Sequence, residues 1–308
     1  MRALVTGGAG FIGSHVVDRL DAAGHEPRIF DLAPSHYHSS TDVDTVTGDL
    51  LDPDSLRRAM VGVDAVIHLA AVADVNEVDA DPAYAEAVNT RGTFNVLEAA
   101  AAVGVGHVIY GSTIWVYDGH VGVADEDTPV AAPGHLYTAT KLAGEMYCRA
   151  HSRRHGLATT VLRFGIPFGP RSRQAAVVAA FVKRALAGEP LTIAGDGSQS
   201  RRFVYVEDLA DGVVAALDPV ARDRTYNLVG TESVTIRRIA DVVRSLIGNV
   251  DIMHVEKRAG DFTGAEVSAS RAAADLGWVA GTPFVEGVRR YIDWLRARET
   301  ALEARSVG

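Results

Sequence analysis

The segment Thr6-Gly7-Gly8-Ala9-Gly10-Phe11-Ile12-Gly13 decides how the rest of the chain is interpreted. It has the spacing G-x-x-G-x-x-G, follows a short apolar run at residues 2–6, and precedes an amphipathic stretch, residues 14–23, that predicts a helix. Glycines let a backbone turn tightly against a pyrophosphate, whose charge is then stabilised at the N-terminal end of the helix. The segment therefore predicts a strand–turn–helix that binds a dinucleotide.

Two acidic residues follow at places that suit such a ligand. Asp31 ends the second predicted strand, residues 26–31, and a carboxylate there accepts hydrogen bonds from both ribose hydroxyls of NAD. The same charge repels an adenosine 2′-phosphate, and no Arg or Lys follows closely, so NAD is favoured over NADP. Asp49, in Gly48-Asp49-Leu50, is placed to accept a hydrogen bond from the adenine amino group. The alternatives are a solvated acid at a strand end for Asp31 and an ordinary turn acid for Asp49.

Short apolar runs alternate with amphipathic segments along most of the chain, which is typical of βαβ units around a parallel sheet. The pattern predicts an α/β protein with a Rossmann-type doubly wound parallel sheet and a smaller C-terminal α/β substrate-binding domain. We expect residues 1–163, with 202–230 returning to them, to form the NAD-binding domain, and residues 164–201 and 231–308 to form the second. The predicted strands are 2–6, 26–31, 65–69, 107–112, 202–206 and 225–228, and the predicted helices are 14–23, 54–60, 84–103, 175–186, 207–217, 236–247 and 284–298.

Composition excludes several classes of protein. The formal net charge of −9 excludes a basic nucleic-acid binder by bulk charge, yet residues 1–163 hold 11 basic and 21 acidic side chains against 19 and 18 in residues 164–308. A single cysteine, Cys148, leaves no internal disulfide or Cys-rich zinc site and favours a reducing compartment, the cytoplasm. The first residues reach glycines before a signal peptide's apolar segment is complete, and glycines divide the longest uncharged stretch, residues 99–117. Neither a leader nor a membrane span is predicted.

The strongest chemical signal is Tyr137-Thr-Ala-Thr-Lys141, because residues four apart share one face of a helix. A phenol with an ordinary pKa of about 10 is a poor base at neutral pH, and a nearby ammonium stabilises its phenolate. Two other features are set aside. His151 and His155 have a spacing that can bind metal, but the polar residues between them indicate an exposed face, and Cys148 is interpreted as packing. No metal site is predicted.

With these motifs in order, the chain resembles the extended short-chain dehydrogenase/reductase family, and within it the NAD-dependent nucleotide-sugar epimerases and dehydratases. The resemblance covers nearly the whole chain. Further landmarks are His68-Leu-Ala-Ala71, Asn89-Thr-Arg-Gly-Thr93, Ser112-Thr113, Gly169-Pro170, Arg201-Arg-Phe-Val-Tyr-Val-Glu-Asp208 and Arg258-Ala-Gly-Asp261.

The resemblance implies roles for individual residues. Thr113 would hydrogen-bond the reacting sugar hydroxyl, Tyr137 would act as the base, and Lys141 would be its electrostatic partner. The expected cofactor contacts are Gly7, Gly10, Phe11, Ile12, Gly13, Asp31, Asp49, Leu50, Leu69, Ala70, Ala71, Asn89, Tyr137, Lys141, Phe164, Ile166 and Pro167. The expected contacts with the nucleotide-sugar are Thr113, Tyr137, Arg173, Val178, Arg201 and Arg258, where the arginines suit phosphate or carboxylate oxygens.

Carboxylates that this chain lacks after Thr113 indicate which reaction it catalyses. Dehydratases of this kind carry Thr-Asp-Glu where this chain has Thr113-Ile114-Trp115, and decarboxylases of UDP-glucuronate place a Glu at the position of Trp115. The remaining Thr/Tyr/Lys set is that of a 4-epimerase, which removes the O4 proton, passes the C4 hydride to NAD and takes it back on the other face. A dehydratase, decarboxylase or 4-ketoreductase stays open, as does a non-catalytic dinucleotide-sensing protein.

Two further predictions concern the sugar of the substrate and the oligomeric state. Arg173 stands where similar UDP-glucuronate epimerases have an arginine facing the C6 carboxylate, which favours UDP-glucuronate over UDP-glucose, although a solvated loop arginine is the alternative. Two departures are Ile166, where hexose epimerases commonly have Asn, and Arg202, where Asp is usual. Ala-rich faces on residues 84–103 and 136–150 favour a homodimer, with packing inside the chain as the alternative.

Overall fold

A seven-stranded parallel sheet forms the larger lobe of the protein, which a computed structural model describes over residues 1–130, 132–248, 250–256 and 265–306. The strand order is β3-β2-β1-β4-β5-β7-β11, and every neighbouring pair runs parallel. The order reverses between β1 and β4, which makes the sheet doubly wound and confirms the predicted fold class. The strands are β1 (Arg2–Thr6), β2 (Glu26–Asp31), β3 (Asp44–Thr47), β4 (Ala65–His68), β5 (His107–Thr113), β7 (Ala158–Phe164) and β11 (Arg224–Leu228).

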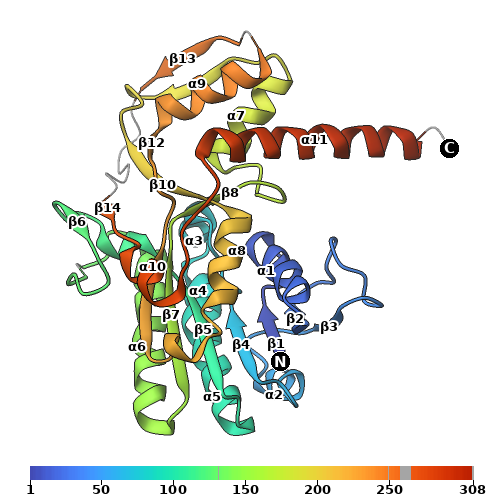
Figure 1. Cartoon of the computed structure of the whole chain (residues 1–308), viewed down its shortest axis with the longest axis vertical. Helices are drawn as coiled ribbons and strands as arrows, with labels where there is room; N and C mark the ends of the chain where they lie inside the picture. The colour runs from blue at the N-terminus through green and yellow to red at the C-terminus, as the bar shows by residue number, and fades with distance from the viewer. Residues whose placement is uncertain (131, 249, 257–264, 307–308) are drawn as a thin grey trace.

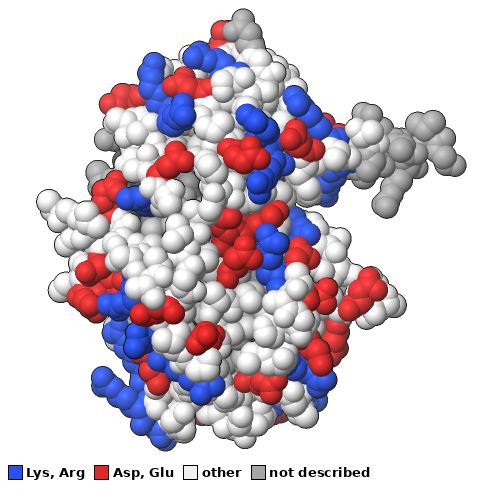
Figure 2. Space-filling model, viewed as in Figure 1, with Lys and Arg blue, Asp and Glu red and all other residues white. Residues whose placement is uncertain are grey.

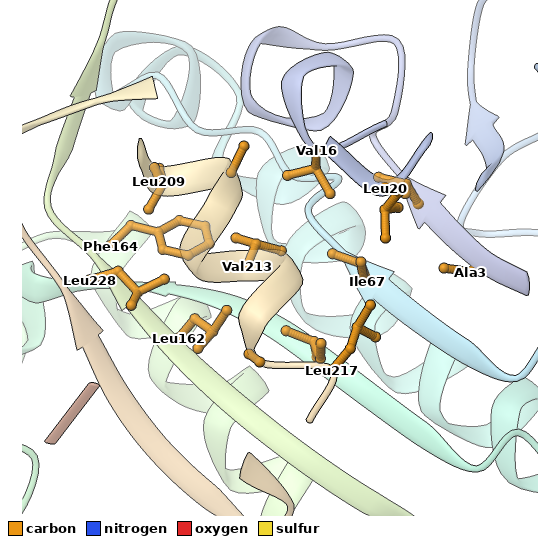
Figure 3. Close-up of a cluster of buried hydrophobic side chains, with 14 of the residues drawn as sticks. Ala3, Val16, Leu20, Ile67, Leu162, Phe164, Leu209, Val213, Leu217 and Leu228 are labelled. Carbon is orange, nitrogen blue, oxygen red and sulfur yellow. The ribbon is translucent and has the colours of Figure 1, made fainter. Parts of the chain in front are cut away.

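Helices bury both faces of this sheet, because alternate residues of each strand point to opposite sides. On β1, Ala3 and Val5 join one apolar core, whereas Leu4 joins the other. Figure 3 shows Val16 and Leu20 from the first helix and Leu209 and Val213 from a later one meeting Ile67 and Leu162 of the sheet. The first face carries α1 (Phe11–Ala22), α8 (Val206–Ala215) and α10 (Ser270–Leu276), and the second carries α2 (Pro53–Ala59), α5 (Gly92–Val103) and α6 (Leu136–His155).

A smaller lobe stands at the carboxyl ends of the strands, at the top of Figure 1, and has an apolar core of its own. Phe168, Phe203 and Phe284 pack together at its centre. The predicted division of the chain into two domains stays a prediction, with which these separate cores agree. The lobe contains β8 (Ile166–Phe168), β9 (Leu191–Ala194), β10 (Ser200–Tyr205), β12 (Ser233–Thr235), β13 (Ile252–Val255), α7 (Val177–Leu186), α9 (Ile236–Ile247) and α11 (Phe284–Ser306).

Several elements differ from the sequence-based expectations. The strand expected at 202–206, in the segment returning to the large sheet, is β10, which instead pairs with β8 and β12 because Phe203 and Tyr205 pack in the smaller core. The helix expected over 84–103 is three pieces: α4 (Pro82–Glu86), a π-helical turn (Ala87–Arg91) and α5. The last helix runs eight residues beyond 298. The elements that the sequence did not predict include the central strand β7 and the smaller-lobe strands β8, β9, β12 and β13. Others are α10, α3 (Val75–Ala80), β6 (Val123–Ala124), β14 (Glu266–Val267) and the 3₁₀ turns Ile114–Tyr117 and Pro219–Ala221.

The sequence assigned no function to Cys148 or His151, and the predictions of their surroundings have opposite outcomes. Cys148 is fully buried in the core beneath α6, as predicted. The interpretation of His151 as part of an exposed polar face is wrong: its side chain is buried against α5, where Phe94 and Glu98 contact the ring. The period of α6 did not reveal this because the neighbouring helix, not the sheet, covers the histidine.

Two sequence-based expectations concern a membrane span and a basic nucleic-acid-binding surface. Over the described residues, no helix combines the length and apolarity needed to cross a membrane. On the face that Figure 2 shows, basic and acidic side chains are interspersed over both lobes, without a continuous basic stripe.

Candidate active site

A cavity of about 610 Å³ opens at the carboxyl edge of the large sheet, where the two lobes meet. Its size lies within the range of small-molecule sites, and its position is the crevice at which open α/β sheets bind ligands. Residues from both lobes line it: Gly7, Gly10, Phe11, Ile12, Gly13, Phe30, Asp31, Leu32, Gly48, Asp49, Leu50, Leu69, Ala70, Ala71, Val72, Ala73, Glu77, Tyr84, Val88, Ser112, Thr113, Trp115, Tyr137, Phe164, Gly165, Ile166, Pro167 and Arg173. Most of the predicted cofactor contacts therefore share one cavity.

The turn after β1 leaves no room for side chains. Gly7 has φ of +73°, and a Cβ there would lie 2.7 Å from the backbone nitrogen of Ala70. A Cβ on Gly13 would lie 2.1 Å from the carbonyl oxygen of Gly7. The backbone can therefore approach a ligand closely at the N-terminus of α1, which fits the pyrophosphate of a dinucleotide.

Asp31 and Asp49 lie on the same side of the cavity as the glycine turn. The Asp31 carboxylate accepts hydrogen bonds from the backbone N–H groups of Ala9, at 3.0 Å, and Leu32, at 2.8 Å. Asp49 accepts one from the N–H of Leu51 at 2.9 Å, which is the bond of a local turn. Both carboxylates are held by backbone donors at the cavity wall, so the arrangement fits the ribose and adenine of a bound dinucleotide.

Thr113, Tyr137 and Lys141 converge from two elements. Thr113 ends β5, and the other two lie on the first turns of α6. Thr113 and Tyr137 line the cavity, while Lys141 is buried beneath them with its Nζ 4.8 Å from the centre of the Tyr110 ring.

Burial shifts both titratable groups toward their neutral forms. It raises the pKa of Tyr137 to about 12, against which the Arg173 guanidinium acts, and lowers the pKa of Lys141 to about 8. The Tyr137 phenolate therefore needs positive charge close to it, and the Arg173 guanidinium supplies some of that charge here.

Aromatic packing holds Tyr137 from the side. The Trp115 ring meets it edge to face, with centroids 6.0 Å apart and an interplanar angle of 84°. Trp115 belongs to the 3₁₀ turn Ile114–Tyr117. Thr113 caps this turn, because its Oγ1 accepts a hydrogen bond from the backbone N–H of Trp115 at 3.2 Å. Apolar side chains thus follow the end of β5, at the positions where the resemblance led us to look for carboxylates.

Asn89 lies behind the cavity wall. On the π-helical turn, its Oδ1 accepts a hydrogen bond from Val72 N at 2.8 Å and its Nδ2 donates to Val72 O at 2.9 Å. The same amide donates to Thr140 Oγ1 at 3.1 Å. Asn89 therefore ties a wall residue to α6 beside Tyr137, whereas the sequence placed it next to the cofactor.

His68 also lies outside the cavity, at the end of β4. The Thr93 hydroxyl donates its only hydrogen to the carbonyl of Asn89, so its oxygen can only accept from the histidine. His68 Nε2 therefore donates to Thr93 Oγ1 at 3.0 Å, and His68 Nδ1 accepts from the Thr6 hydroxyl at 2.7 Å. This pattern fixes a neutral imidazole, and burial lowers its pKa to about 3. His68 is a structural group and not a proton carrier.

The expected substrate residues are only partly brought together. Arg173 lines the cavity and its guanidinium lies 3.5 Å from the carboxylate of Asp74, the N-cap of α3. Val178 does not line the cavity, because its side chain packs in the core of the smaller lobe. Arg201 lies on β10, does not line the cavity, and donates to the carbonyl of Ser200 at 2.9 Å. Arg258 lies outside the described residues.

A buried ion pair supports the catalytic strand and helix from behind. Arg163 on β7 donates to both carboxylate oxygens of Glu145, at 3.0 and 2.7 Å, and Glu145 accepts a third bond from Ser112 Oγ at 2.7 Å. Arg163 also donates to the hydroxyl of Tyr117 at 2.6 Å. Each charge is satisfied on several sides, so removing one partner would cost about 3–5 kcal/mol. A charged residue at the end of the apolar strand 158–164 was the sequence signal for this pair.

Sequence reasoning missed part of the wall. Glu77, Tyr84 and Val88 line the cavity from α3, α4 and the π-helical turn. No motif marks them, because their position depends on how three short helical pieces pack over the sheet. Glu77 adds a carboxylate that the interpretation of Thr113-Ile114-Trp115 did not include.

Comparison with known families agrees with the geometry. The model of the NAD dependent epimerase/dehydratase family matches residues 3–229. The chain is 33% identical over 311 residues to the UDP-glucose 4-epimerase of Mycolicibacterium smegmatis, covering 96% of this chain and 99% of that protein. It is 30% identical to UDP-glucuronic acid decarboxylase 1 of Xenopus tropicalis, covering 96% of this chain and 72% of that protein.

Solved structures resemble it over the whole described fold. The UDP-glucose 4-epimerase of Thermotoga maritima with UDP-glucose has a TM-score of 0.91 at 28% identity, covering 97% of this chain and 99% of that one. MoeE5 in complex with UDP-glucuronic acid and NAD has a TM-score of 0.89 at 29% identity, covering 97% and 100%.

Proposed function

The chain belongs to the NAD-dependent epimerase/dehydratase family, with NAD as its cofactor, and we propose that within this family it inverts C4 of a UDP-sugar. One observation carries the proposal. Thr113 and Tyr137 line the cavity, Lys141 is buried one helical turn after Tyr137, and the apolar Ile114 and Trp115 follow directly on the strand end. That set provides for proton transfer at one hydroxyl without an acid–base pair for elimination.

The glycine turn, Asp31 and Asp49 would hold the dinucleotide, with its nicotinamide end beside Phe164, Ile166 and Pro167. NAD, when bound, accepts the hydride from the sugar carbon and returns it. The wall from Leu69 to Ala71 excludes water along the cofactor's length, which strengthens the electrostatic interactions inside.

The proton steps belong to Tyr137. Its Oη takes the proton from O4 of the sugar and later returns it, and Lys141, one helical turn further along α6, is proposed as the ammonium that stabilises the phenolate. Thr113 Oγ1 binds the same hydroxyl and keeps it in line with the phenol. The flat apolar face of Trp115 offers the sugar few polar contacts, so the ring can turn and present its other face.

The preferred substrate in this proposal is UDP-glucuronate, followed by UDP-glucose. Arg173 supports the choice, because a guanidinium at the cavity wall can bind a C6 carboxylate through charge-assisted hydrogen bonds. Asp74 already contacts it, so a uronate would have to compete with that carboxylate.

A second candidate is decarboxylation or dehydration of a UDP-sugar. It is favoured by Glu77, a carboxylate at the cavity wall, and by the similarity to a decarboxylase. In that case Glu77→Gln would abolish product formation. For a 4-epimerase, the variant would still form the C4 epimer.

The deciding experiment is a product analysis. The purified enzyme is incubated with UDP-glucuronate, UDP-glucose, UDP-N-acetylglucosamine and TDP-glucose, and products are resolved by chromatography and mass spectrometry. The proposal expects a product of unchanged mass that differs at C4. Loss of the mass of CO₂ or of water would establish the second candidate instead.

We also propose that the protein is a homodimer paired through α5 and α6, and that it acts in the cytoplasm. Leu136 and Met146 leave apolar surface on α6, at 41% and 46% exposure, although Ala99 and Ala100 of α5 pack inside their own chain. The lone cysteine, Cys148, suits a reducing compartment. Light scattering tests the pairing, and a monomer at micromolar concentration would contradict it.

A further inference from the structure

A cluster of two histidines and a glutamate lies far from the cavity, at the other end of α6. His151 and His155 are one turn apart on this helix, and Glu98 faces them from α5. The three ligand atoms lie within 4.8 Å of one another. Figure 1 shows α5 and α6 running together toward the end of the large lobe opposite the smaller lobe. At 1.5 Å per helical residue, His155 stands about 27 Å from Tyr137, too far to take part in the reaction.

Hydrogen bonding decides which nitrogen of His151 faces the glutamate. Its Nδ1 lies 2.8 Å from the carbonyl oxygen of Tyr147, which can only accept, so Nδ1 carries the hydrogen. In a neutral ring Nε2 is then a bare acceptor, and it faces the Glu98 carboxylate oxygen at 2.9 Å. Two acceptors at this distance require a proton or a metal ion between them.

The geometry suits a metal. The Glu98 oxygen lies 2.9 Å from His151 Nε2 and 3.8 Å from His155 Nε2. Ligand atoms about 2.0 Å from a tetrahedral zinc ion stand about 3.3 Å apart, which falls between these two separations. His155 is one-third exposed and Glu98 about half exposed, so both can adjust, while buried His151 is fixed by Tyr147 and by the edge of Phe94. A histidine oriented through its second nitrogen is the usual arrangement of a metal ligand.

We propose that Glu98, His151 and His155 bind one Zn²⁺ per chain and thereby join α5 to α6. Two imidazole nitrogens and one carboxylate oxygen are ligands for zinc and its neighbours, not for Mg²⁺ or Ca²⁺, which prefer oxygen alone. Three protein ligands leave a fourth position for water. The ion stabilises the folded state by binding to it, because the unfolded chain does not hold the three groups together.

The test is calorimetric titration of chelator-treated protein with Zn²⁺, together with thermal unfolding. Wild type is expected to bind one ion, and at a free concentration about 100 times Kd the unfolding temperature should rise by roughly 5 °C. His155→Ala and Glu98→Gln change partly exposed side chains, so both should fold and should bind zinc at least about 10-fold more weakly. His120→Ala, an exposed histidine elsewhere, is the matched control and should bind as wild type does.

The contrary outcomes are equally defined. Equal zinc affinity in wild type and His155→Ala would overturn the site, as would failure of wild type to bind one ion. The cation between His151 and Glu98 would then be a proton. Because binding and unfolding are measured without substrate, neither result depends on whether the enzyme is a 4-epimerase.

Discussion

The cavity has two ends that differ in what forms their surface: the end at the glycine turn, which we call the cofactor end, and the end at Tyr137, which we call the sugar end. At the cofactor end the backbone forms the surface: Gly7 and Gly13 leave no space for a Cβ, and backbone N–H groups hold Asp31. At the sugar end, side chains from distant segments form it, with Tyr137 packed on Trp115 and Arg173 facing Asp74. The first end can therefore bind one ligand type in many relatives, and the second is where relatives that differ in substrate can diverge.

The largest expected effect tests the sugar end. Tyr137→Phe removes the hydroxyl to which the proposal assigns the O4 proton, so turnover should fall by roughly 10²- to 10⁴-fold. NAD should remain bound, because the glycine turn and Asp31 are unchanged and Tyr137 is one of many expected contacts with the cofactor. Turnover is measured by chromatography of the epimer, and NAD content by absorbance after release.

Tyr84→Phe is the matched control for this change. Tyr84 also lines the cavity, but it lies on α4 and is 45% exposed, so its variant should keep turnover near wild type. If Tyr137→Phe retained more than about a tenth of the activity, a general-base role worth 10²-fold or more would be ruled out.

The same contrast explains what could be predicted from the sequence. The cofactor end follows from local order: a strand, a glycine turn, a helix, and an acid at the next strand end place Gly7, Gly13 and Asp31 without knowledge of the rest. Tyr137 and Lys141 were likewise predicted from helical spacing.

Contacts between distant segments were not predictable in this way. Glu77 reaches the wall through a short helix with no motif, and Arg173 meets Asp74 across the two lobes. The burial of His151 depends on α5, and the place of β10 in the smaller sheet depends on Phe203. In each case a partner remote in sequence decides the position, and periodicity carries no information about that partner.

A second prediction concerns two buried histidines of the large sheet, His68 at the end of β4 and His107 at the start of β5. Burial lowers the pKa of His68 to about 3 and that of His107 to about 4, from an ordinary 6.5. Below pH 6.5 the unfolded chain binds protons at these two histidines and the folded chain does not. Their contribution to the free energy of unfolding is therefore fully present above that pH and is lost as the pH falls toward 4. Each histidine should contribute about 1.4 kcal/mol per pH unit to this loss.

Urea unfolding between pH 7 and 4.5 measures the slope. His107→Gln should remove one of the two contributions, because its amide can donate to Thr160 Oγ1 as Nε2 of the ring does at 2.8 Å, yet takes up no proton. His120→Ala, which changes an exposed ring, should keep the wild-type slope. An unchanged slope in His107→Gln would show that this histidine is protonated in the folded state as readily as in the unfolded one.

A third prediction tests how rigid the cofactor end is. Gly13→Ala puts a Cβ 2.1 Å from the Gly7 carbonyl oxygen, so the turn must shift. We expect a loss of about 1–3 kcal/mol in unfolding free energy and weaker retention of NAD. Gly281→Ala is the control, because that position is open and has an ordinary φ. Equal NAD content in the two variants would mean that the turn is not the phosphate cradle.

The smallest expected effect separates the two ends by substrate. Arg173→Ala should lower kcat/KM for UDP-glucuronate by roughly 10-fold more than for UDP-glucose, equivalent to about 1.4 kcal/mol. The loss is modest because the guanidinium is half exposed. A loss shared by both substrates would reflect the effect of the guanidinium on the pKa of Tyr137. NAD retention should not change in this variant, since the arginine lies at the sugar end.

Asp74→Asn sharpens the same comparison by a change of opposite sign. Asp74 contacts Arg173 at 3.5 Å and caps α3 through its other oxygen, which an asparagine can still do. Freed from the carboxylate, Arg173 should bind a uronate better, so kcat/KM for UDP-glucuronate should rise while that for UDP-glucose stays level. If both substrates lost equally in Arg173→Ala, and neither gained in Asp74→Asn, then Arg173 would be a wall residue without a part in substrate choice.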